Sequence, residues 1–272
     1  METKSPETKT YDGNCHCGAF KFTVKLPPKP YHTCNCSICS KNGYIGIWPL
    51  GDEDFTIHQG KGSLTKYQFG NKSLEHYFCP KCGSSIIGRM SDPRPGADIG
   101  LNIRMLKSFN EYFEANKHDN PPINFADVEP LYQTPPFPAH PDAETLPADQ
   151  KIYNGNCHCG AVTYAVKTTP LEEQKVMNCN CSLCSRNGDL WIYPPKSAVI
   201  LRGGENLTDY AFLSKESLHS FCKICGSSVL VRVSEEAGGE CPVNVRTIDG
   251  VDLASLTLQN YDGAKNDPQY EV

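Results

Sequence analysis

The chain of 272 residues carries one pattern of cysteines twice, and this repetition limits its fold more than any other feature. The first half reads "CHC", "CNCSIC" and "CPKC", and the second half reads "CHC", "CNCSLC" and "CKIC" in the same order. The flanking text repeats as well, as in "GNCHCGAFKFTV" and "GNCHCGAVTYAV". Self-similarity of this kind indicates a tandem duplication. We therefore expect two ordinary domains rather than one large core.

The stretch between the copies, "TPPFPAHPDAETLPADQ" at 134–150, contains five prolines and favours an extended, semi-rigid spacer. We expect a flexible tail at 1–10, a first domain at 11–132, a proline-rich linker at 133–150 and a second domain at 151–272. These two domains are called the first and second copy below. Each copy has its own full set of repeated cysteines, so each should fold alone with its metal.

Within each copy the hydrophobic pattern predicts β-structure. Phe20, Phe22, Val24 and Leu26 alternate with polar residues, and Val162, Tyr164 and Val166 repeat the alternation. Further strands are predicted at 84–90, 98–106, 227–234 and 241–248. Helical periodicity is found only near "SFNEYFEANK" at 108–117. The expected fold class is mainly β, with two tandem zinc-bearing domains of small sheets.

The composition narrows the environment and the partners. The first ten residues, "METKSPETKT", do not resemble a signal peptide, and no segment approaches the roughly 18 apolar residues of a spanning helix. We therefore expect a cytoplasmic or nuclear protein with no membrane partner. Fifteen cysteines in a reducing compartment indicate metal thiolates rather than disulfides. The net charge of −5 argues against a nucleic-acid partner. The oligomeric state is left open.

The C-x-x-C-G segments have the form of zinc knuckles, each of which supplies half of a four-ligand site. The other half is expected from the "CHC" near the start of the same copy. The resulting closed sites are Cys15, Cys17, Cys79 and Cys82 in the first copy, and Cys157, Cys159, Cys222 and Cys225 in the second. The alternative is a set of buried thiols without metal.

Three cysteines per copy remain after this assignment: Cys34, Cys36 and Cys39, and Cys179, Cys181 and Cys184. Three ligands and an open position are typical of a catalytic zinc, and zinc deprotonates a bound thiol, so the fourth ligand could be the sulfur of a substrate. Two alternatives compete. His32, His76 or an acid closes the site, or the three cysteines bind metal only weakly.

The order C-x-C, C-x-C-x-x-C and F-C-x-x-C-G-S resembles the glutathione-dependent formaldehyde-activating enzyme family, which includes the centromere protein V branch. The resemblance covers both copies. It implies a β-tent fold, one structural and one functional zinc per domain, hence four Zn²⁺ per chain, and carbon–sulfur lyase chemistry on thiol adducts such as S-hydroxymethylglutathione. Family members acting on that adduct typically read Cys-His-Cys in the functional triplet. Asn35 and Asn180 stand at the middle position here, closer to the centromere protein V branch.

Other repeated residues are candidates for supporting roles. His76 and His219 each lie three residues before the first knuckle cysteine and could move a proton. Residues that could hold a substrate carboxylate are Lys41, Arg186, Arg104 and Arg246. Trp48 and Tyr193 wall a pocket or pack in the core. Cys241 has no counterpart and is expected to be a buried small residue.

Two functions of different classes follow. The leading hypothesis is an enzyme, a zinc-dependent carbon–sulfur lyase that binds a small thiol or glutathione adduct through sulfur. The second is a non-catalytic zinc-binding module for a protein or chromatin partner, in which the triplets are structural. A third arrangement, one active copy beside one scaffolding copy, stays open because both triplets are intact.

Overall fold

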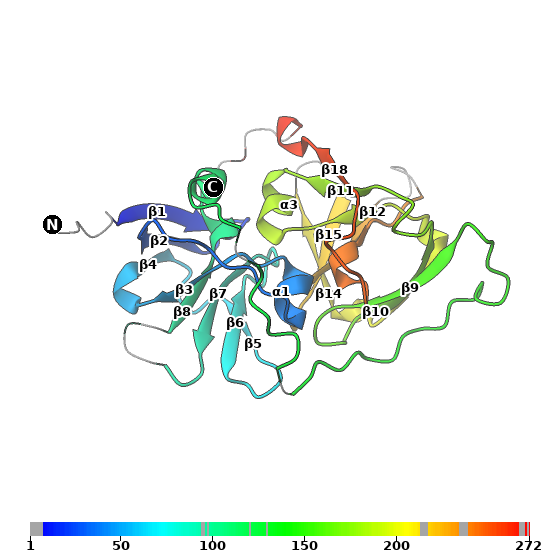
Figure 1. Cartoon of the computed structure of the whole chain (residues 1–272), viewed down its shortest axis with the longest axis horizontal. Coiled ribbons are helices and arrows are strands. Elements are labelled where there is room, and N and C mark those ends of the chain that lie inside the picture. Colours follow the sequence, from blue (N-terminus) through cyan, green and yellow to red (C-terminus); the bar gives the residue numbers. More distant parts are fainter. Residues whose placement is uncertain are drawn as a thin grey trace.

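The computed structural model describes residues 8–93, 96, 98–119, 121–128, 130–212, 217–233, 239–266, 270 and 272. Each half of the chain forms two β-sheets of its own, and Figure 1 shows the halves side by side. Every sheet takes its strands from one half only. The structure confirms the expected mainly β class with two domains, while the numbered domain boundaries stay predictions.

The first copy has a three-stranded sheet in the order β1-β2-β4 and a five-stranded sheet in the order β3-β8-β7-β6-β5. All of its strand pairs are antiparallel. The strands are β1 (Lys9–Asn14), β2 (Lys21–Leu26), β3 (Gly46–Leu50), β4 (Phe55–Gln59), β5 (Thr65–Tyr67), β6 (Leu74–Phe78), β7 (Ser85–Met90) and β8 (Ile99–Asn102).

The second copy repeats this plan with a three-stranded sheet, β13-β10-β9, and a seven-stranded sheet, β14-β15-β16-β17-β12-β11-β18. Its last strand, β18, pairs with β11 in parallel. The strands are β9 (Lys151–Asn156), β10 (Thr163–Thr168), β11 (Val176–Cys179), β12 (Trp191–Ile192), β13 (Val199–Arg202), β14 (Leu207–Ala211), β15 (Ser217–Cys222), β16 (Ser228–Val233), β17 (Val243–Asn244) and β18 (Leu258–Tyr261).

Three α-helices are present in the described residues: α1 (Ser37–Asn42), α2 (Phe109–Ala115) and α3 (Ser182–Asn187). The sequence predicts α2, whereas α1 and α3 are six-residue helices inside the cysteine triplets, too short for a hydrophobic period. Single 3-10 turns are η1 (Asp52–Asp54), η2 (Ile103–Met105), η3 (Lys196–Ala198), η4 (Gly204–Asn206), η6 (Val245–Thr247) and η7 (Gly263–Lys265). The strands predicted at 98–106 and 241–248 therefore end in 3-10 turns.

Each copy has its own apolar core. The alternation in β2 buries Phe22, Val24 and Leu26 on one face, as the sequence predicts. In β10 the pattern differs, because Ala165 is buried as well as Tyr164 and Val166. The spacer at 134–150 has no helix or strand and lies along the second copy, where the buried His140 contacts the carbonyl of Ala198.

The two copies also pack directly against each other. Helices α1 and α3 lie near the centre of the molecule in Figure 1. Helix α1 packs against η6 of the second copy, and α3 packs against η2 of the first. This reciprocal exchange is the contact expected of a two-fold pair formed within one chain. No helix in the described part of the chain is both long and apolar enough to cross a membrane.

Candidate metal centres

The four cysteines expected at each closed site converge in both copies, with all four Sγ atoms within 4.8 Å of one another. The Sγ atoms of Cys15 and Cys17 lie 3.6 Å apart, and those of Cys17 and Cys79 lie 3.7 Å apart. A tetrahedral zinc with Zn–S bonds of about 2.3 Å separates its sulfurs by about 3.8 Å. The arrangement therefore fits a Cys₄ zinc site, and its twin in the second copy has the same spacing of 3.6 Å.

Local structure explains why these sulfurs meet. Cys15 and Cys17 follow strand β1, and Cys79 and Cys82 form the turn between β6 and β7, so two adjacent chain reversals face each other. Gly83 closes the knuckle with a φ of +73°, a backbone conformation that favours glycine. The amide of Phe20 donates to Cys15 Sγ at 3.2 Å. Such donors stabilise a thiolate and leave it free to bind metal.

The triplets converge as well, each around the first turn of a short helix. Cys36 and Cys181 are the N-cap residues of α1 and α3, and the three Sγ atoms of each triplet lie within 4.8 Å of one another. The thiols of Cys36 and Cys39 hydrogen-bond to Cys34 and lower its pKa to about 3, and the same arrangement acts on Cys179. These hydrogen bonds favour the thiolate form of Cys34 and Cys179, which is the form that binds metal.

No fourth protein ligand joins either triplet in the described ranges of the chain. The metal-compatible groups there contain only the three cysteines, without a histidine nitrogen or a carboxylate oxygen within the same 4.8 Å. The side chains of His32 and His76, the alternatives considered from the sequence, lie outside these groups. The geometry thus matches the open-site interpretation better than the closed one.

His76 and His219 lie in equivalent positions on β6 and β15. The His76 ring stacks between Tyr44 and Phe69, with centroids 6.0 and 5.6 Å away. Burial lowers the pKa of both histidines to about 4, so both rings are neutral at pH 7. His76 Nε2 and His219 Nδ1 have no hydrogen-bond partner within the described structure. Their proton-transfer role stays a prediction.

The four cations proposed to hold a carboxylate lie at the boundary between the copies. Lys41 Nζ donates to the carbonyls of Asn156 and Thr247, both at 3.2 Å. Arg104 donates to the carbonyls of Gly43 and Ser185 at 2.7 and 2.8 Å.

Arg246 of the second copy makes the equivalent contacts, since it donates to the carbonyls of Gly188 and Ser40. Arg186 lies over the ring of Tyr270, at 5.0 Å from its centroid. Lys41, Arg104 and Arg246 therefore join the copies, whereas the contacts of Arg186 with Tyr270 and the Ser182 carbonyl lie within the second copy. A role in substrate binding stays a prediction for all four.

The histidine inside each "CHC" motif is a contact that the sequence did not reveal. His16 lies 2.9 Å from Tyr210 Oη and 3.0 Å from Ser182 Oγ, both in the second copy. His158 reciprocates, at 2.8 Å from Tyr67 Oη and 2.9 Å from Ser37 Oγ. Ser37 and Ser182 directly follow Cys36 and Cys181. The histidine between two closed-site cysteines of one copy therefore contacts the serine next to the triplet of the other copy.

Asn35, the middle residue of the first triplet, is a second contact that the sequence did not reveal. Its side-chain oxygen accepts from the amides of Phe125 and Ala126 at 2.8 and 3.1 Å, and its amide donates to Asn124 at 2.9 Å. Asn180 binds Asp262 and Ala264 in the same way, both at 2.9 Å. The asparagine repeated between the cysteines was the sequence signal that could have indicated this contact. It ties the end of each copy to its own triplet.

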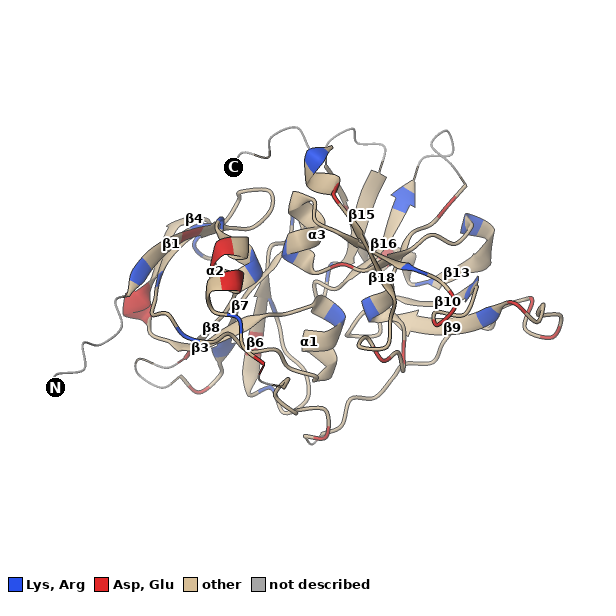
Figure 2. Cartoon of the chain, turned by 45° about the horizontal axis from the view of Figure 1, so that its top comes forward, with Lys and Arg blue, Asp and Glu red and all other residues tan. Residues whose placement is uncertain are grey.

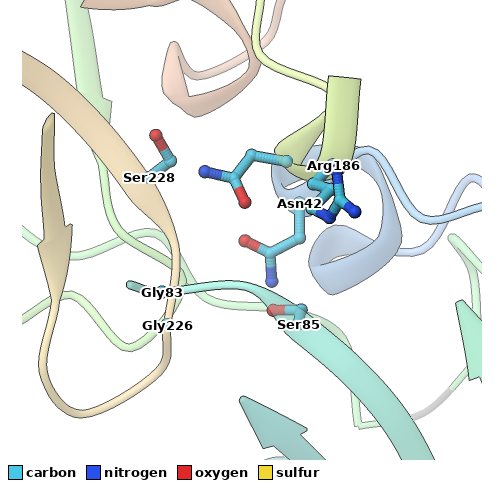
Figure 3. A pocket seen from close by; sticks show the side chains of 7 residues that line it. Asn42, Gly83, Ser85, Arg186, Gly226 and Ser228 are labelled. Carbon is cyan, nitrogen blue, oxygen red and sulfur yellow. The ribbon is translucent and has the colours of Figure 1, made fainter. Parts of the chain in front are cut away.

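Two hollows lie at the boundary between the copies. Figure 3 shows the smaller one, of about 10 Å³, where Asn42, Arg186, Ser85 and Ser228 come together. It has room for about one water molecule and none for a substrate. The larger hollow is a groove of about 230 Å³, lined in part by Tyr67, Phe69, Tyr132 and His158.

Of the two residues predicted to wall a pocket or pack in the core, Trp48 lies on β3 and Tyr193 directly follows β12. Trp48 packs across Gly100, where an added Cβ would lie 2.1 Å from the indole. Tyr193 is 41% exposed and its hydroxyl lies 3.0 Å from Met177 Sδ. Cys241, expected to be a buried small residue, is only partly buried and packs against the core of the second copy. In the view of Figure 2, basic and acidic residues are interspersed over both copies.

The fold and the four clusters define a class of protein: tandem mainly β domains that each present a Cys₄ and a Cys₃ metal-compatible site. The family model "Glutathione-dependent formaldehyde-activating enzyme" matches residues 10–117 and 152–261. The chain belongs to this family and contains two tandem copies of it.

Two known proteins resemble single copies. A relative from Halomonas elongata, whose name assigns it to the glutathione-dependent formaldehyde-activating enzymes, is 36% identical over 91 residues. This match covers 30% of the present chain and 57% of the relative, so the chain spans little more than half of the relative's length. A solved structure of a Rhodobacter sphaeroides protein is 31% identical, with a TM-score of 0.35, covering 39% of this chain and 99% of that one.

Proposed function

We propose that the protein is a zinc-dependent carbon–sulfur lyase that acts on a small thiol adduct, of the glutathione thiohemiacetal type or a related thioether. The observation that carries the proposal is the convergence of three cysteines in each copy without a fourth protein ligand in the described residues. Three protein ligands and one exchangeable position are the arrangement of catalytic zinc sites. The name of the Halomonas relative points to the same substrate class.

Zinc is the metal that suits these donor sets. Thiolate sulfurs favour zinc and other soft ions, and the sulfur spacing at the closed sites matches a tetrahedral ion. The closed sites would hold a structural zinc, and the triplets would hold a zinc whose vacant position takes the substrate sulfur. The chain would then bind four zinc ions.

The chemistry required of the protein is one proton transfer coupled to one bond cleavage. In a thiohemiacetal R–S–CH₂–OH, a base removes the hydroxyl proton, the C=O bond forms, and the C–S electron pair passes to sulfur. The bound zinc would supply a Lewis acid that stabilises the departing thiolate. We assign the base to His76 in the first copy and His219 in the second, because each is neutral and has an unpaired ring nitrogen. The proton then returns to the thiolate, giving RSH and formaldehyde.

Both histidines are linked to their triplets through one aromatic ring. Tyr44 stacks on His76. Burial raises the pKa of the Tyr44 hydroxyl, and the negative charge of the nearby Cys39 raises it further. Trp191 contacts the His219 ring at 5.9 Å between centroids and donates to Cys184 Sγ at 3.3 Å.

We assign the natural location of the protein to the cytoplasm, where free thiols are abundant.

The test is turnover of S-hydroxymethyl adducts of glutathione and of 2-mercaptoethanol by the full-length protein. We expect the double variant Cys36→Ser/Cys181→Ser to lose turnover while remaining folded. Cys241→Ser is the matched control, because it removes a cysteine outside all four clusters and should keep full turnover. A folded double variant with unchanged turnover would exclude catalysis at the triplets.

The alternative is a non-catalytic zinc module that binds a protein partner. One observation favours it: Ile123, Phe125 and Val128 beside the first triplet are 40%, 51% and 53% exposed. Exposed apolar side chains grouped on one segment are typical of an interaction surface. If no thiol adduct is turned over and the double variant unfolds, the triplets are structural and this alternative is favoured.

A further inference from the structure

The two triplets have different surroundings, although their cysteines are spaced identically. We propose that the first triplet accepts a small thiol as its fourth ligand, whereas the second is closed by residues of its own copy. The proposal rests on the proposed function, since it states which of the two sites meets the substrate. It also makes a claim about ligand access that is measurable without turnover.

A tryptophan covers the second triplet. Trp191 is 2% exposed and donates its indole N–H to Cys184 Sγ at 3.3 Å. Cys184, Trp191 and Val231 form an apolar cluster, and Met177 is among the residues packed against it. Cys184 itself is 4% exposed. A thiol approaching this triplet would have to displace packed apolar side chains.

The backbone of the second copy closes the triplet from another direction. A Cβ added to Gly263 would lie 2.5 Å from Cys179 Sγ and 3.1 Å from Cys181 Cβ. The main chain at the start of η7 is therefore in contact with the triplet. Asn180 holds this segment in place through the amide of Ala264. No side chain larger than hydrogen would fit at position 263 without displacing a cysteine.

The first copy has glycines where the second has its covering side chains. Gly46 and Trp191 each lie seven residues after the last triplet cysteine, and Gly88 and Val231 each lie six residues after the second knuckle cysteine. A Cβ at Gly46 would meet only the carbonyl oxygen of His32, at 3.8 Å. The indole that covers the second triplet is thus absent from the first.

The remaining surroundings of the first triplet agree with this difference. Cys34, Cys36 and Cys39 are all partly exposed, and none belongs to an apolar core cluster of the described structure. Phe125 corresponds to Gly263, because each directly follows the residue that accepts from the triplet asparagine of its copy. The Phe125 side chain is 51% exposed.

The first triplet also has a hollow near it. The groove of about 230 Å³ includes His158, which bonds to Ser37 next to Cys36. The contact between His158 and Ser37 therefore connects this groove to the residue beside Cys36.

The experiment exchanges the residues that differ. Full-length protein is loaded with Co²⁺ and titrated with 2-mercaptoethanol, and the change in ligand-field absorption is measured. The wild-type protein should show the response of one site. Gly46→Trp should abolish it, and Trp191→Gly should double it by opening the second triplet. Equal responses from two sites in the wild type, or a response that survives Gly46→Trp in a folded protein, would overturn the proposal.

A second variant keeps the test informative if Gly46→Trp does not fold. Cys36→Ser removes a ligand of the first triplet only and should abolish the entire thiol response and all turnover, whereas two equivalent sites would leave about half of each. A one-site thiol response without turnover of any adduct would support the inequivalence and refute the lyase. Turnover that is halved by Cys36→Ser would support the lyase and refute the inequivalence.

Discussion

At the scale of single residues, the seven repeated cysteines of each copy divide into two chemical environments. The four of the closed site are mostly buried, as Cys82 is at 2% exposure, and Cys15 accepts a hydrogen bond from the amide of Phe20. The three of the triplet lie at the start of a short helix and, except for the buried Cys184, are partly exposed. Metal bound at the closed site should therefore stabilise the fold, and metal bound at the triplet should mainly serve chemistry.

This difference predicts opposite consequences for two identical substitutions. Cys82→Ser should unfold or aggregate the protein, because metal-binding free energy in small zinc modules is also folding free energy, on the order of 10 kcal/mol. Cys36→Ser should stay folded and lose one zinc, since an open site tolerates ligand exchange. Thermal unfolding and zinc content of both variants, with Cys241→Ser as the control, measure the contrast. Equal destabilisation would make both classes of site structural.

The repeat marks the cysteines, so the sequence predicts which of them converge in the structure, whereas the partners of His16 and Asn35 could not be predicted. Asn35 binds a segment that begins almost ninety residues later, at Asn124. His16 binds Ser182 across the boundary between the copies. Such contacts depend on how folded elements pack, and no local pattern encodes them.

At the scale of elements, the knuckle turns connect the zinc sites to the boundary between the copies. Gly83 has a φ of +73°, and an added Cβ would lie 2.7 Å from the ring of Phe221 in the other copy. Gly226 has a φ of +76° and meets Phe78 in the same way, at 2.6 Å. Each turn is therefore restricted both by its backbone and by the neighbouring copy.

We expect Gly83→Ala to destabilise the protein more than its matched control, Gly62→Ala. Both residues have left-handed backbones, and alanine there costs about 1–2 kcal/mol. Gly62, at a φ of +77°, has nothing within 4 Å of an added Cβ, so its substitution should cost no more than that strain. Urea unfolding of the two variants, with zinc content measured in parallel, gives the difference. Equal losses of stability would show that Phe221 moves aside freely.

Strands with strict alternation, such as β2, could be predicted from the sequence, but the short helices α1 and α3 could not. Each has six residues, and polar or cysteine residues occupy most of its positions. The 3-10 turns η2 and η6 interrupt segments that otherwise resemble strands. In both, an asparagine side chain at the start of the turn accepts from the arginine amide two residues later. These endings depend on local hydrogen bonds rather than on hydrophobic periodicity.

At the scale of the whole molecule, the copies form a reciprocal pair whose contacts include buried charges. Lys41 and Arg186 are 6% and 9% exposed at this boundary. The duplication and the spacer could be predicted from the sequence, but this packing could not, because the residues that form it resemble ordinary surface charges. That each copy folds alone with zinc stays a prediction, and separation would expose Lys41 and His158.

We therefore expect the halves to stay together when the spacer is cut. A protease site inserted after Glu144, in an exposed part of the spacer, would allow cleavage of the folded protein. The cut protein should elute in gel filtration as one species at the volume of the uncut protein, and give two fragments on a denaturing gel. The same sample in urea should separate. Elution as two smaller species under native conditions would mean that the spacer, rather than the boundary, holds the copies together.

The central claim is that the chain carries four metal sites, two with four cysteine ligands and two with three. Metal analysis of the full-length protein, purified without chelator, tests it most directly. We predict about four zinc ions per chain, corresponding to the four cysteine groups in the structure. About two per chain would contradict the account, because the triplets would then not be metal sites and the proposed chemistry would have no centre.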